Sequence, residues 1–370
     1  MQASEFFHHA LNNCDAFFSR EFNLARQRFL DAGSDLTLSH TNKSWQLEDD
    51  LHCDTLWVGS HAAENVLVLI SGTHGVEGYC GSGVQNFILQ SIKQDLISLP
   101  CNTALLFIHA LNPWGMKHYR RCDQDGIDLN RNFVDFSMPL PVNSGYSNYL
   151  EKLAGIQSNQ RFHAIEQFAK ELGQQSFDEV FSGGQYHCDW GPFYGGQQAS
   201  WSNRVIEEIV NHYQLNEKCL IVLDIHSGLG PWGFGELISD HPLGSNGANF
   251  AHQLFENAVA QTLMGGSFSV SKHGLLDYRW QQMMQTHGCF LTLEFGSFGT
   301  AALFQVLLDD HLLHREKTGL SEAEIHQQAQ QMLQHFCPKN SFWEQAVLFK
   351  SWQVVEQTLK KLSGSNHVIA

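Results

Sequence analysis

The sequence predicts an α/β protein with a mixed, mostly parallel central sheet that is flanked by helices on both faces. Fully apolar runs of strand length recur at Val66–Ile70 (VLVLI), Ala104–His109 (ALLFIH), Cys219–Asp224 (CLIVLD) and Cys289–Glu294 (CFLTLE). Such runs are typical of strands that are buried on both faces. Segments with helical periodicity separate them, as in a sheet assembled from alternating strands and helices.

The remaining elements follow in chain order. An opening helix is expected over residues 3–32, because apolar residues recur there at helical spacing. Leu51–Val58 resembles a strand, and a Gly-containing turn at Ser71–Gly75 leads into a helix from about Gly81 to Leu96. Later helices are expected near Asn246–Leu263 and Leu275–Thr286, and over much of the remaining chain.

Residues 1–370 are expected to form a single α/β domain. Residues from about 136 to 216 break the alternation of strands and helices with a turn-rich stretch, helical material and a Gly- and aromatic-rich loop. We interpret this segment as an insertion beside the functional site. The loop carries Trp190, Phe193 and Tyr194, which we expect to pack or to face a substrate as part of a lid.

Charge and composition exclude several classes of partner. The net charge is −16, from 22 Lys+Arg and 38 Asp+Glu, so neither nucleic acid nor an anionic membrane is expected as a partner. The nine cysteines are isolated, which suits a reducing compartment. There is no secretory signal pattern and no apolar stretch long enough to span a membrane, so we expect a cytoplasmic protein.

The first apolar strand is followed by Ser-Gly-Thr-His74-Gly-Val-Glu77, and the strand CLIVLD runs into His226. Ligand sites of α/β sheets lie at the carboxyl ends of strands. Two imidazoles and one carboxylate suit a catalytic Zn²⁺, which takes three protein ligands and leaves one position open. Any single histidine among the 21 in the chain is more often structural. The three residues together predict one zinc ion per chain.

Two further features accompany these ligands. Asp128 is a candidate to accept the second N–H of a metal-binding imidazole, although it would also serve to cap a turn. Arg121 and Arg131 lie on either side of a Gly-containing turn, and two guanidinium groups that converge would bind a carboxylate. Taken alone, these arginines fit equally well with a surface cluster paired to acids.

The motifs resemble those of a known family. His74-x-x-Glu77, the N-P-x-G…R…G-I-D-L-N-R-N-F segment, I-H-S-G around His226 and L-T-L-E-F-G around Glu294 occur in this order between Val66 and Gly299. In this respect the chain resembles the zinc carboxypeptidases (carboxypeptidase A-like metallopeptidases) and their aspartoacylase and succinylglutamate desuccinylase relatives. The resemblance implies the carboxypeptidase-like (phosphorylase/hydrolase-like) fold.

The resemblance also assigns roles by position. It implies zinc ligands at His74, Glu77 and His226, and a partner for the first imidazole at Asp128. Asn130 and Arg131 match the pair that holds a terminal carboxylate, Arg121 matches the residue that polarises the scissile carbonyl, and Glu294 matches the catalytic glutamate. Tyr278, the nearest tyrosine before Glu294, is the candidate gating and substrate-binding tyrosine. The 136–216 insertion and the helices beyond about 310 have no counterpart in the pattern.

These assignments predict a zinc-dependent metallopeptidase of carboxypeptidase type that cleaves an amide bond next to a free carboxylate with an activated water. Its partner would be a small peptide or an N-acyl amino acid with a free carboxylate. The first alternative is an amidohydrolase that deacylates N-acyl amino acids, and the second is a catalytically silent metal-dependent binding protein. A dinucleotide-binding site is disfavoured because no G-x-G-x-x-G follows the strand. A serine hydrolase is disfavoured because G-x-S-x-G is absent.

Overall fold

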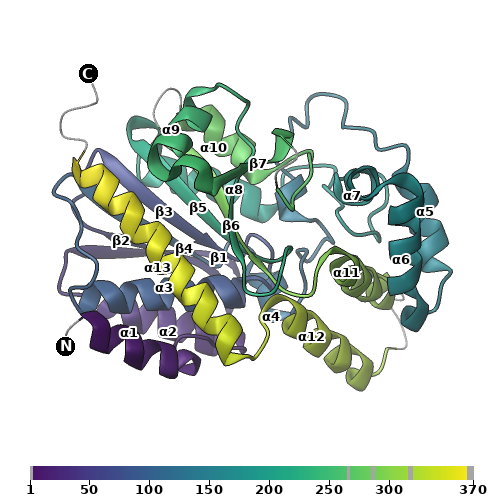
Figure 1. Ribbon diagram of the computed structural model, residues 1–370, viewed down its shortest axis with the longest axis horizontal. Helices are drawn as coiled ribbons and strands as arrows, with labels where there is room; N and C mark the ends of the chain where they lie inside the picture. The colour runs from purple at the N-terminus through teal and green to yellow at the C-terminus, as the bar shows by residue number, and fades with distance from the viewer. Residues whose placement is uncertain (1–2, 265–266, 285–287, 316–319, 365–370) are drawn as a thin grey trace.

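The structure, a computed structural model, describes residues 3–264, 267–284, 288–315 and 320–364. The described residues contain an eight-stranded sheet in the order β1-β2-β4-β3-β5-β8-β6-β7 (Figure 1). The strands are β1 (His40–Glu48), β2 (Leu51–Val58), β3 (Asn65–Ser71), β4 (Thr103–His109), β5 (Cys219–Gly228), β6 (Gly235–Ser239), β7 (Val259–Gln261) and β8 (Gly288–Gly296).

The four apolar runs of the sequence form the centre of this sheet. They are β4, β3, β5 and β8, which lie next to one another in that order and are all parallel. The pairs β1–β2, β2–β4 and β6–β8 are antiparallel, and β6–β7 is parallel. The sheet is therefore mixed and mostly parallel, as predicted.

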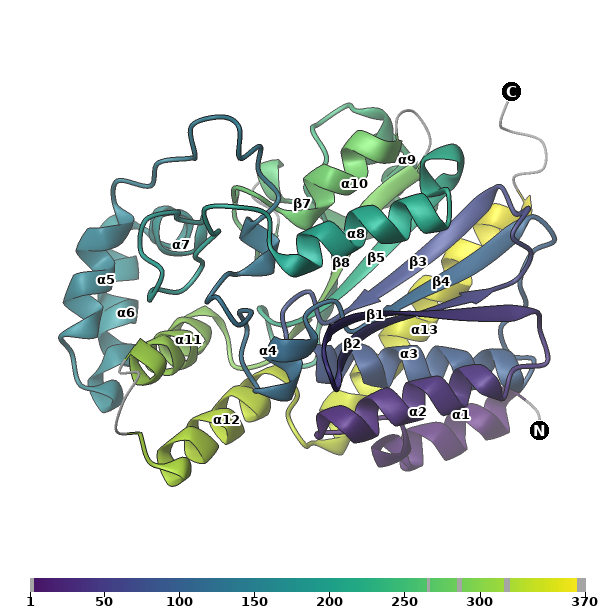
Figure 2. The ribbon, with the colours of Figure 1, turned by 180° about the vertical axis from the view of Figure 1, so that it is seen from behind.

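Helices cover both faces, and the alternation of side chains along β3 shows how. Leu67 and Leu69 point into a core with α1 (Ala3–Asn12), α2 (Phe22–Ser34), α3 (Gly78–Lys93), α9 (Asn246–Phe255) and α13 (Ser341–Gly364). Val66 and Val68 point the opposite way, into a core with α8 (Trp201–His212) and α10 (Leu276–Met284). Figures 1 and 2 show these two helical layers from opposite sides. Because successive side chains of a strand point to opposite faces, a strand with apolar residues at every position packs against the helices on both faces.

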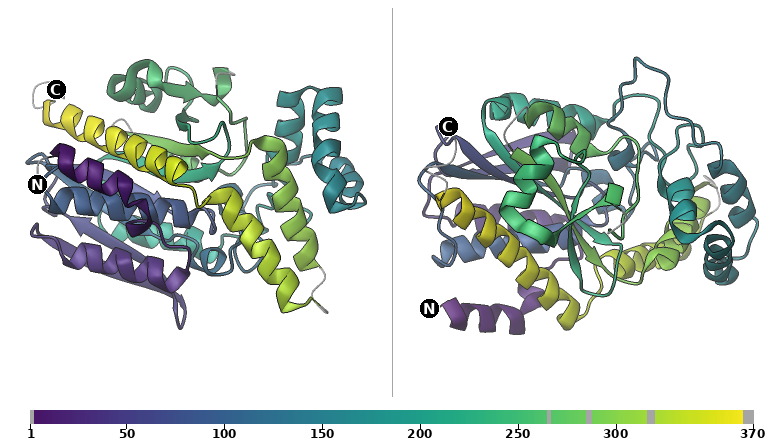
Figure 3. Two further views of the ribbon diagram at one scale, coloured as in Figure 1. Left: turned by 60° about the horizontal axis from the view of Figure 1, so that its bottom comes forward. Right: turned by 45° about the horizontal axis from the view of Figure 1, so that its top comes forward.

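A third group of helices lies beyond the end of the sheet (Figures 1 and 3). Within the predicted insertion at 136–216, α6 packs against α7 and against α11 of the C-terminal part, whereas α8 returns to the sheet. The remaining helices are α4 (Pro113–Lys117), α5 (Tyr146–Ala154), α6 (Ser158–Leu172), α7 (Gln174–Ser182), α11 (Thr300–Arg315) and α12 (Glu322–Phe336). None of the helices in the described ranges has the length and apolarity that crossing a bilayer requires.

Two predicted elements differ from the structure, and a third extends beyond the described residues. The helix expected over 3–32 is wrong, because it is broken between α1 and α2, where the Glu21 side chain accepts hydrogen bonds from the amides of Asn23 (3.0 Å) and Leu24 (2.8 Å) and caps α2. The helix expected near 246–263 ends at Phe255, and β7 follows. Of the helix expected over 275–286, the last two positions lie outside the described residues.

Candidate active site

His74 and Glu77 lie in the turn between β3 and α3, and Glu77 is the residue that precedes α3. The amides of Gly75 and Val76 donate to the carbonyls of Arg121 (3.1 Å) and Arg120 (2.9 Å), which fixes this turn against the arginine segment. Glycine at position 75 permits the close approach, because a Cβ there would lie 2.1 Å from the Gly115 carbonyl carbon.

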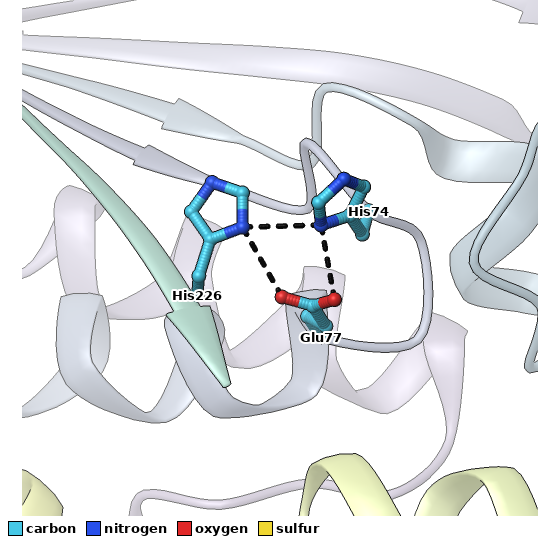
Figure 4. A group of neighbouring side chains, drawn as sticks. All are labelled: His74, Glu77 and His226. Carbon is cyan, nitrogen blue, oxygen red and sulfur yellow. Dashed lines mark hydrogen bonds and ion pairs between the residues drawn. The ribbon is translucent and has the colours of Figure 1, made fainter. Parts of the chain in front are cut away.

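His226 lies near the end of β5, which pairs with β3 in parallel register, so its imidazole reaches the same edge of the sheet as His74. The Nδ1 atoms of the two histidines are 3.1 Å apart. Glu77 Oε1 is 2.9 Å from His74 Nδ1, and Oε2 is 3.2 Å from His226 Nδ1. Figure 4 shows the three side chains pointing toward a common centre from two elements. All three are buried.

Each imidazole is held by a carboxylate on its outer nitrogen. His74 Nε2 donates to Asp128 Oδ1 (3.1 Å), as predicted, and His226 Nε2 donates to Asp224 Oδ2 (2.7 Å). The Thr73 hydroxyl donates to the other oxygen of Asp224 (2.7 Å). Sequence reasoning missed Asp224, although residues two apart on a strand share a face. With both N–H groups directed outward, the inner Nδ1 lone pairs face the Glu77 carboxylate, and a cation is needed to hold them together.

The charges around the three side chains favour positive charge at their centre. Burial opposes ionisation of Glu77 and Asp128, yet the His74 imidazole and the Arg121 guanidinium hold the pKa of each carboxyl below its usual range. For His226, burial lowers the pKa, but Asp224 and Glu77 outweigh it, so the net pKa is raised. Protons or a metal ion would satisfy this preference.

The donor set fits zinc. Nitrogen and oxygen ligands bind zinc at about 2.0–2.2 Å in a tetrahedral arrangement, which places ligand atoms about 3.3 Å apart. The three inner contacts, at 2.9, 3.1 and 3.2 Å, are close to that spacing. His74, Glu77 and His226 could therefore hold the ion with little rearrangement, with Asp128 and Asp224 orienting the two rings.

Arg121 lies directly beside this centre. Its Nε donates to Asp128 (3.0 Å) and its Nη1 to Glu77 (2.6 Å), and it lines the same cavity as the three ligands. The adjacent Arg120 does not line this cavity, and its Nε donates to Asp310 (2.9 Å). The two adjacent arginines therefore have different surroundings, and only Arg121 reaches the cavity.

Asn130 and Arg131 also line the cavity. Asn130 Oδ1 accepts from the Leu276 amide (2.8 Å), which orients the side chain. The Arg131 guanidinium donates to the carbonyls of Ser182 (2.7 Å from Nη2) and Asn130 (2.6 Å from Nη1) and lies over the Phe193 ring at 5.4 Å. Among the described residues, no carboxylate forms an ion pair with Arg131, so its charge is held by neutral carbonyl oxygens and an aromatic face.

Glu294 is the fourth carboxyl of the site. β8 pairs with β5 so that Glu294 lies opposite His226, and both residues line the cavity. Its Oε1 accepts from the Leu229 amide (3.0 Å). Burial, followed by the nearby charge of Glu77, raises the pKa of Glu294 to about 7. A carboxyl with a pKa near neutrality can both accept and release a proton.

Residues 18–350 match the model of a protein family of unknown function, DUF2817. The chain belongs to this family. No curated protein matches the sequence. Among solved structures, carboxypeptidase A from Helicoverpa armigera is similar, with a TM-score of 0.54 and 12% sequence identity over 91% of this chain and 72% of that one. This DUF2817 member therefore has the fold of carboxypeptidase A, as the sequence motifs implied.

Two further solved structures are similar at lower TM-scores. Bovine thrombin-activatable fibrinolysis inhibitor, in a complex with tick carboxypeptidase inhibitor, gives a TM-score of 0.47 at 10% identity over 92% of this chain and 98% of that one. A succinylglutamate desuccinylase from a Silicibacter species gives 0.39 at 12% identity over 75% and 66% of the two chains.

Tyr278 is the predicted site residue of this DUF2817 member that the structure does not bring to the cavity. It lies in the first turn of α10, and its hydroxyl donates to the Lys272 carbonyl (2.9 Å). It is not among the residues that line the cavity. Its role in substrate binding remains a prediction, and its observed contact is with the backbone of a residue that does line the cavity.

The cavity has a volume of about 790 Å³, including its open mouth. The insertion contributes Phe193 to its wall, as the loop interpretation anticipated. The cavity also contains four charged residues that sequence reasoning missed, because none follows an apolar strand directly in a recognisable motif. They are Asp178, Asp240, Lys272 and Asp277.

Proposed function

We propose that this chain is a zinc-dependent metallopeptidase of carboxypeptidase type, acting on a small peptide with a free carboxylate. One observation carries the proposal. Two imidazoles, each with its outer N–H bound by a carboxylate, turn their remaining lone pairs toward Glu77, and Glu294 shares their cavity. A purely structural zinc site would be closed by a fourth protein ligand, whereas a three-residue set leaves a position open for chemistry.

When bound there, a zinc ion supplies Lewis-acid chemistry, which lowers the pKa of water and polarises a carbonyl. Glu294 accepts a proton from the attacking water through its carboxylate, and then delivers that proton to the departing nitrogen. Its pKa of about 7 suits both roles in the metal-free chain. The Leu229 amide orients the carboxylate by binding Oε1 and leaves Oε2 available for the proton.

Arg121 supplies positive charge at the reacting carbonyl. Its guanidinium already donates to Glu77 through Nη1 and to Asp128 through Nε, so its positive charge is held in a fixed position beside the reacting carbonyl. A single preorganised donor of this kind contributes about 3–4 kcal/mol to the transition state.

Arg131 and Asn130 orient the free carboxylate of the substrate. Of the five N–H donors on a guanidinium, the Arg131 contacts to Ser182 and Asn130 occupy three, which leaves two. With no acid paired to this cation in the described residues, a substrate carboxylate can bind it without displacing a competing carboxylate.

The test is a hydrolysis assay on zinc-loaded protein, with peptides that have a free C-terminus, the same peptides amidated at that end, and N-acyl amino acids. We expect cleavage of the free-carboxylate peptides. Glu294→Gln should retain its zinc and lose activity at least about 100-fold, which is the lower end of what general acid–base catalysis contributes. Glu208→Gln, a change at an exposed glutamate of α8, should leave activity unchanged.

Two outcomes contradict the proposal. Release of acyl groups from N-acyl amino acids without peptide cleavage would identify a deacylase. Stoichiometric zinc with no turnover of any amide would identify a metal-dependent binding protein.

A further inference from the structure

The cavity continues inward from Glu294 as a pocket along β8. Phe290, Thr292 and Glu294 alternate along the strand, so they share one face, and all three line the cavity. At about 3.3 Å per residue, this face extends about 13 Å, which is enough for a long extended amino-acid side chain. On the neighbouring antiparallel strand β6, Ile238 pairs with Thr292, which brings Asp240, two residues after Ile238, toward the Phe290 end of the pocket.

Lys272 contributes a cation to this pocket. Its ammonium donates to the hydroxyl of Ser269 and to the carbonyl of Val270 (3.0 Å), both of which are neutral. Across the described ranges, it forms no ion pair with a carboxylate. Its charge is therefore available to an anionic group that enters the cavity.

The segment that carries Lys272 is held firmly in place. The Glu236 carboxylate accepts from the Ser267 hydroxyl (3.1 Å) and from the Phe268 amide (3.2 Å), and the Tyr278 hydroxyl donates to the Lys272 carbonyl (2.9 Å). These contacts from β6 and α10 fix the segment on both sides of Ser269. The lysine is thus positioned by the fold rather than free to seek an acid elsewhere.

Asp277 contributes a buried carboxyl group with one unpaired oxygen. Burial and then the charge of Asp240 hold its pKa well above the usual range, so its anionic form is favoured only when a cation lies beside it. Its Oδ2 accepts from Gln281 (2.8 Å), but its Oδ1 is buried and has no hydrogen-bond partner in the part of the chain that is described. The residue is only 3% exposed and lines the cavity. A buried carboxylate oxygen without a donor costs about 1–3 kcal/mol or more, so an N–H group placed there would stabilise the complex.

Lys272 and Asp277 together limit which substrate side chains can bind in the pocket. Lys272 and Asp277 interact electrostatically with each other, and each interacts with Asp240. A purely anionic side chain would meet Lys272 but would be repelled by Asp240 and Asp277. A purely cationic side chain would meet the two acids but would be repelled by Lys272. A group that carries both charges satisfies both sides of the pocket.

We propose that the pocket recognises a substrate side chain that ends in both an ammonium and a carboxylate, with Lys272 binding the carboxylate and Asp277, beside Asp240, binding the ammonium. This inference rests on the proposed function and names its substrate class: a peptide whose C-terminal residue is a diamino dicarboxylic acid. Arg131 would take the main-chain carboxylate at the other end of the same residue.

Four C-terminal residues of matched length test the proposal. They are 2,6-diaminopimelate with both groups, lysine without the distal carboxylate, 2-aminopimelate without the distal ammonium, and norleucine with neither. Binding of the four free amino acids to zinc-loaded protein is measured by calorimetry, and hydrolysis is measured on peptides that end in each. We expect diaminopimelate to bind at least tenfold more tightly than the other three, and its peptide to have a kcat/KM at least tenfold higher.

Two variants should change the relative affinities for lysine and 2-aminopimelate in opposite directions. Lys272→Met should weaken diaminopimelate binding at least tenfold and leave lysine binding equal or tighter. Asp277→Asn should likewise weaken diaminopimelate binding and favour 2-aminopimelate over lysine. Lys170→Met, at an exposed position of α6, is the matched control and should change nothing.

The calorimetric measurement separates this inference from the proposed function. Equal affinity for the four amino acids, within a factor of about two, overturns the inference even if every peptide is cleaved. A tenfold preference for diaminopimelate with no cleavage of any peptide supports the pocket assignment and rejects the hydrolase. If a variant does not fold, the wild-type affinities alone decide the outcome.

Discussion

The two ends of the cavity differ in how completely the protein satisfies its own polar groups. At the metal end, His74 and His226 are bound by carboxylates on their outer nitrogens, and Arg121 joins Glu77 to Asp128. At the pocket end, the hydrogen-bond acceptors of Lys272 among the described residues are neutral, and Asp277 Oδ1 has no hydrogen-bond partner among them. The polar groups of the first end are therefore bound to one another, whereas those of the second end leave hydrogen-bonding capacity unused.

The difference follows from the elements that build each end. The candidate metal ligands and Glu294 lie near the carboxyl ends of the central parallel strands or in the turn that follows β3, and backbone ladders fix the registers of these strands. The charged residues of the pocket lie just after β6 (Asp240), in the segment that precedes α10 (Lys272) and on α10 (Asp277), and this segment is held by contacts of the Glu236 and Tyr278 side chains. Backbone hydrogen bonds between strands position side chains more precisely than loop contacts do. The side chains of the pocket can therefore differ without moving the residues at the metal end.

The largest expected effect comes from removing a ligand at the metal end. His226→Ala should lose stoichiometric zinc and reduce kcat/KM at least about 1,000-fold, because a Lewis acid contributes several kcal/mol to the transition state. Zinc content after dialysis and hydrolysis rates measure both effects. The exposed His163→Ala is the control. Full zinc occupancy in His226→Ala would place the metal elsewhere.

The second largest effect is expected from replacing Arg131, the residue proposed to bind the substrate carboxylate. Arg131→Lys should raise KM about tenfold or more for a peptide with a free carboxylate, because an ammonium keeps the charge but loses the planar pair of donors. The same change should have little effect on a C-terminally amidated peptide if that peptide is cleaved at all. An equal loss on both substrates would show that Arg131 acts through the fold and not on the carboxylate.

A smaller effect is expected from the partner of one imidazole. Asp224→Asn should weaken zinc binding about 10–100-fold, because the amide no longer fixes the ring with its Nδ1 lone pair directed inward. Competition with a chelator of known affinity measures the change. Thr73→Val, which removes the hydroxyl that donates to Asp224, should weaken binding less. Unchanged zinc affinity in Asp224→Asn would mean that the outer hydrogen bond does not orient the ligand.

The smallest effect concerns the stability of the metal-free protein. Burial raises the pKa of Glu294 to about 7, so the folded protein holds this proton more tightly than the unfolded chain does. The resulting stabilisation is complete below about pH 4 and is lost as the pH rises through about 7. Glu294→Gln should therefore be more stable than the wild type above pH 7, by about 3 kcal/mol at most, and should match it near pH 4.

Urea unfolding in the presence of a chelator at several pH values checks this stability prediction. The glutamine carbonyl can still accept from the Leu229 amide, so this hydrogen bond is retained in the variant. A difference that did not change with pH would show that burial of the charge at Glu294 is not its cause.

Several features could be predicted from the sequence because their signals are local. Each central strand appears as a continuous apolar run, and His74, Glu77, His226 and Glu294 follow or end those runs. Asp128, in the segment between Arg121 and Arg131, was expected to accept the second N–H of a metal-binding imidazole, and it lies within hydrogen-bond distance of His74. Asp224 has an equally local signal, two residues before His226 on the same strand.

The sequence by itself predicted the central strands of the sheet and the positions of His74, Glu77, His226 and Glu294 at their carboxyl ends, because strand burial and strand ends depend on neighbours along the chain. The break between α1 and α2, the contact of Arg131 with Ser182 and the placement of Lys272, Asp240 and Asp277 along one cavity were decided only by the tertiary structure. These features depend on which distant segments come together in the fold, and on whether a charge finds a partner there. No local pattern records that outcome.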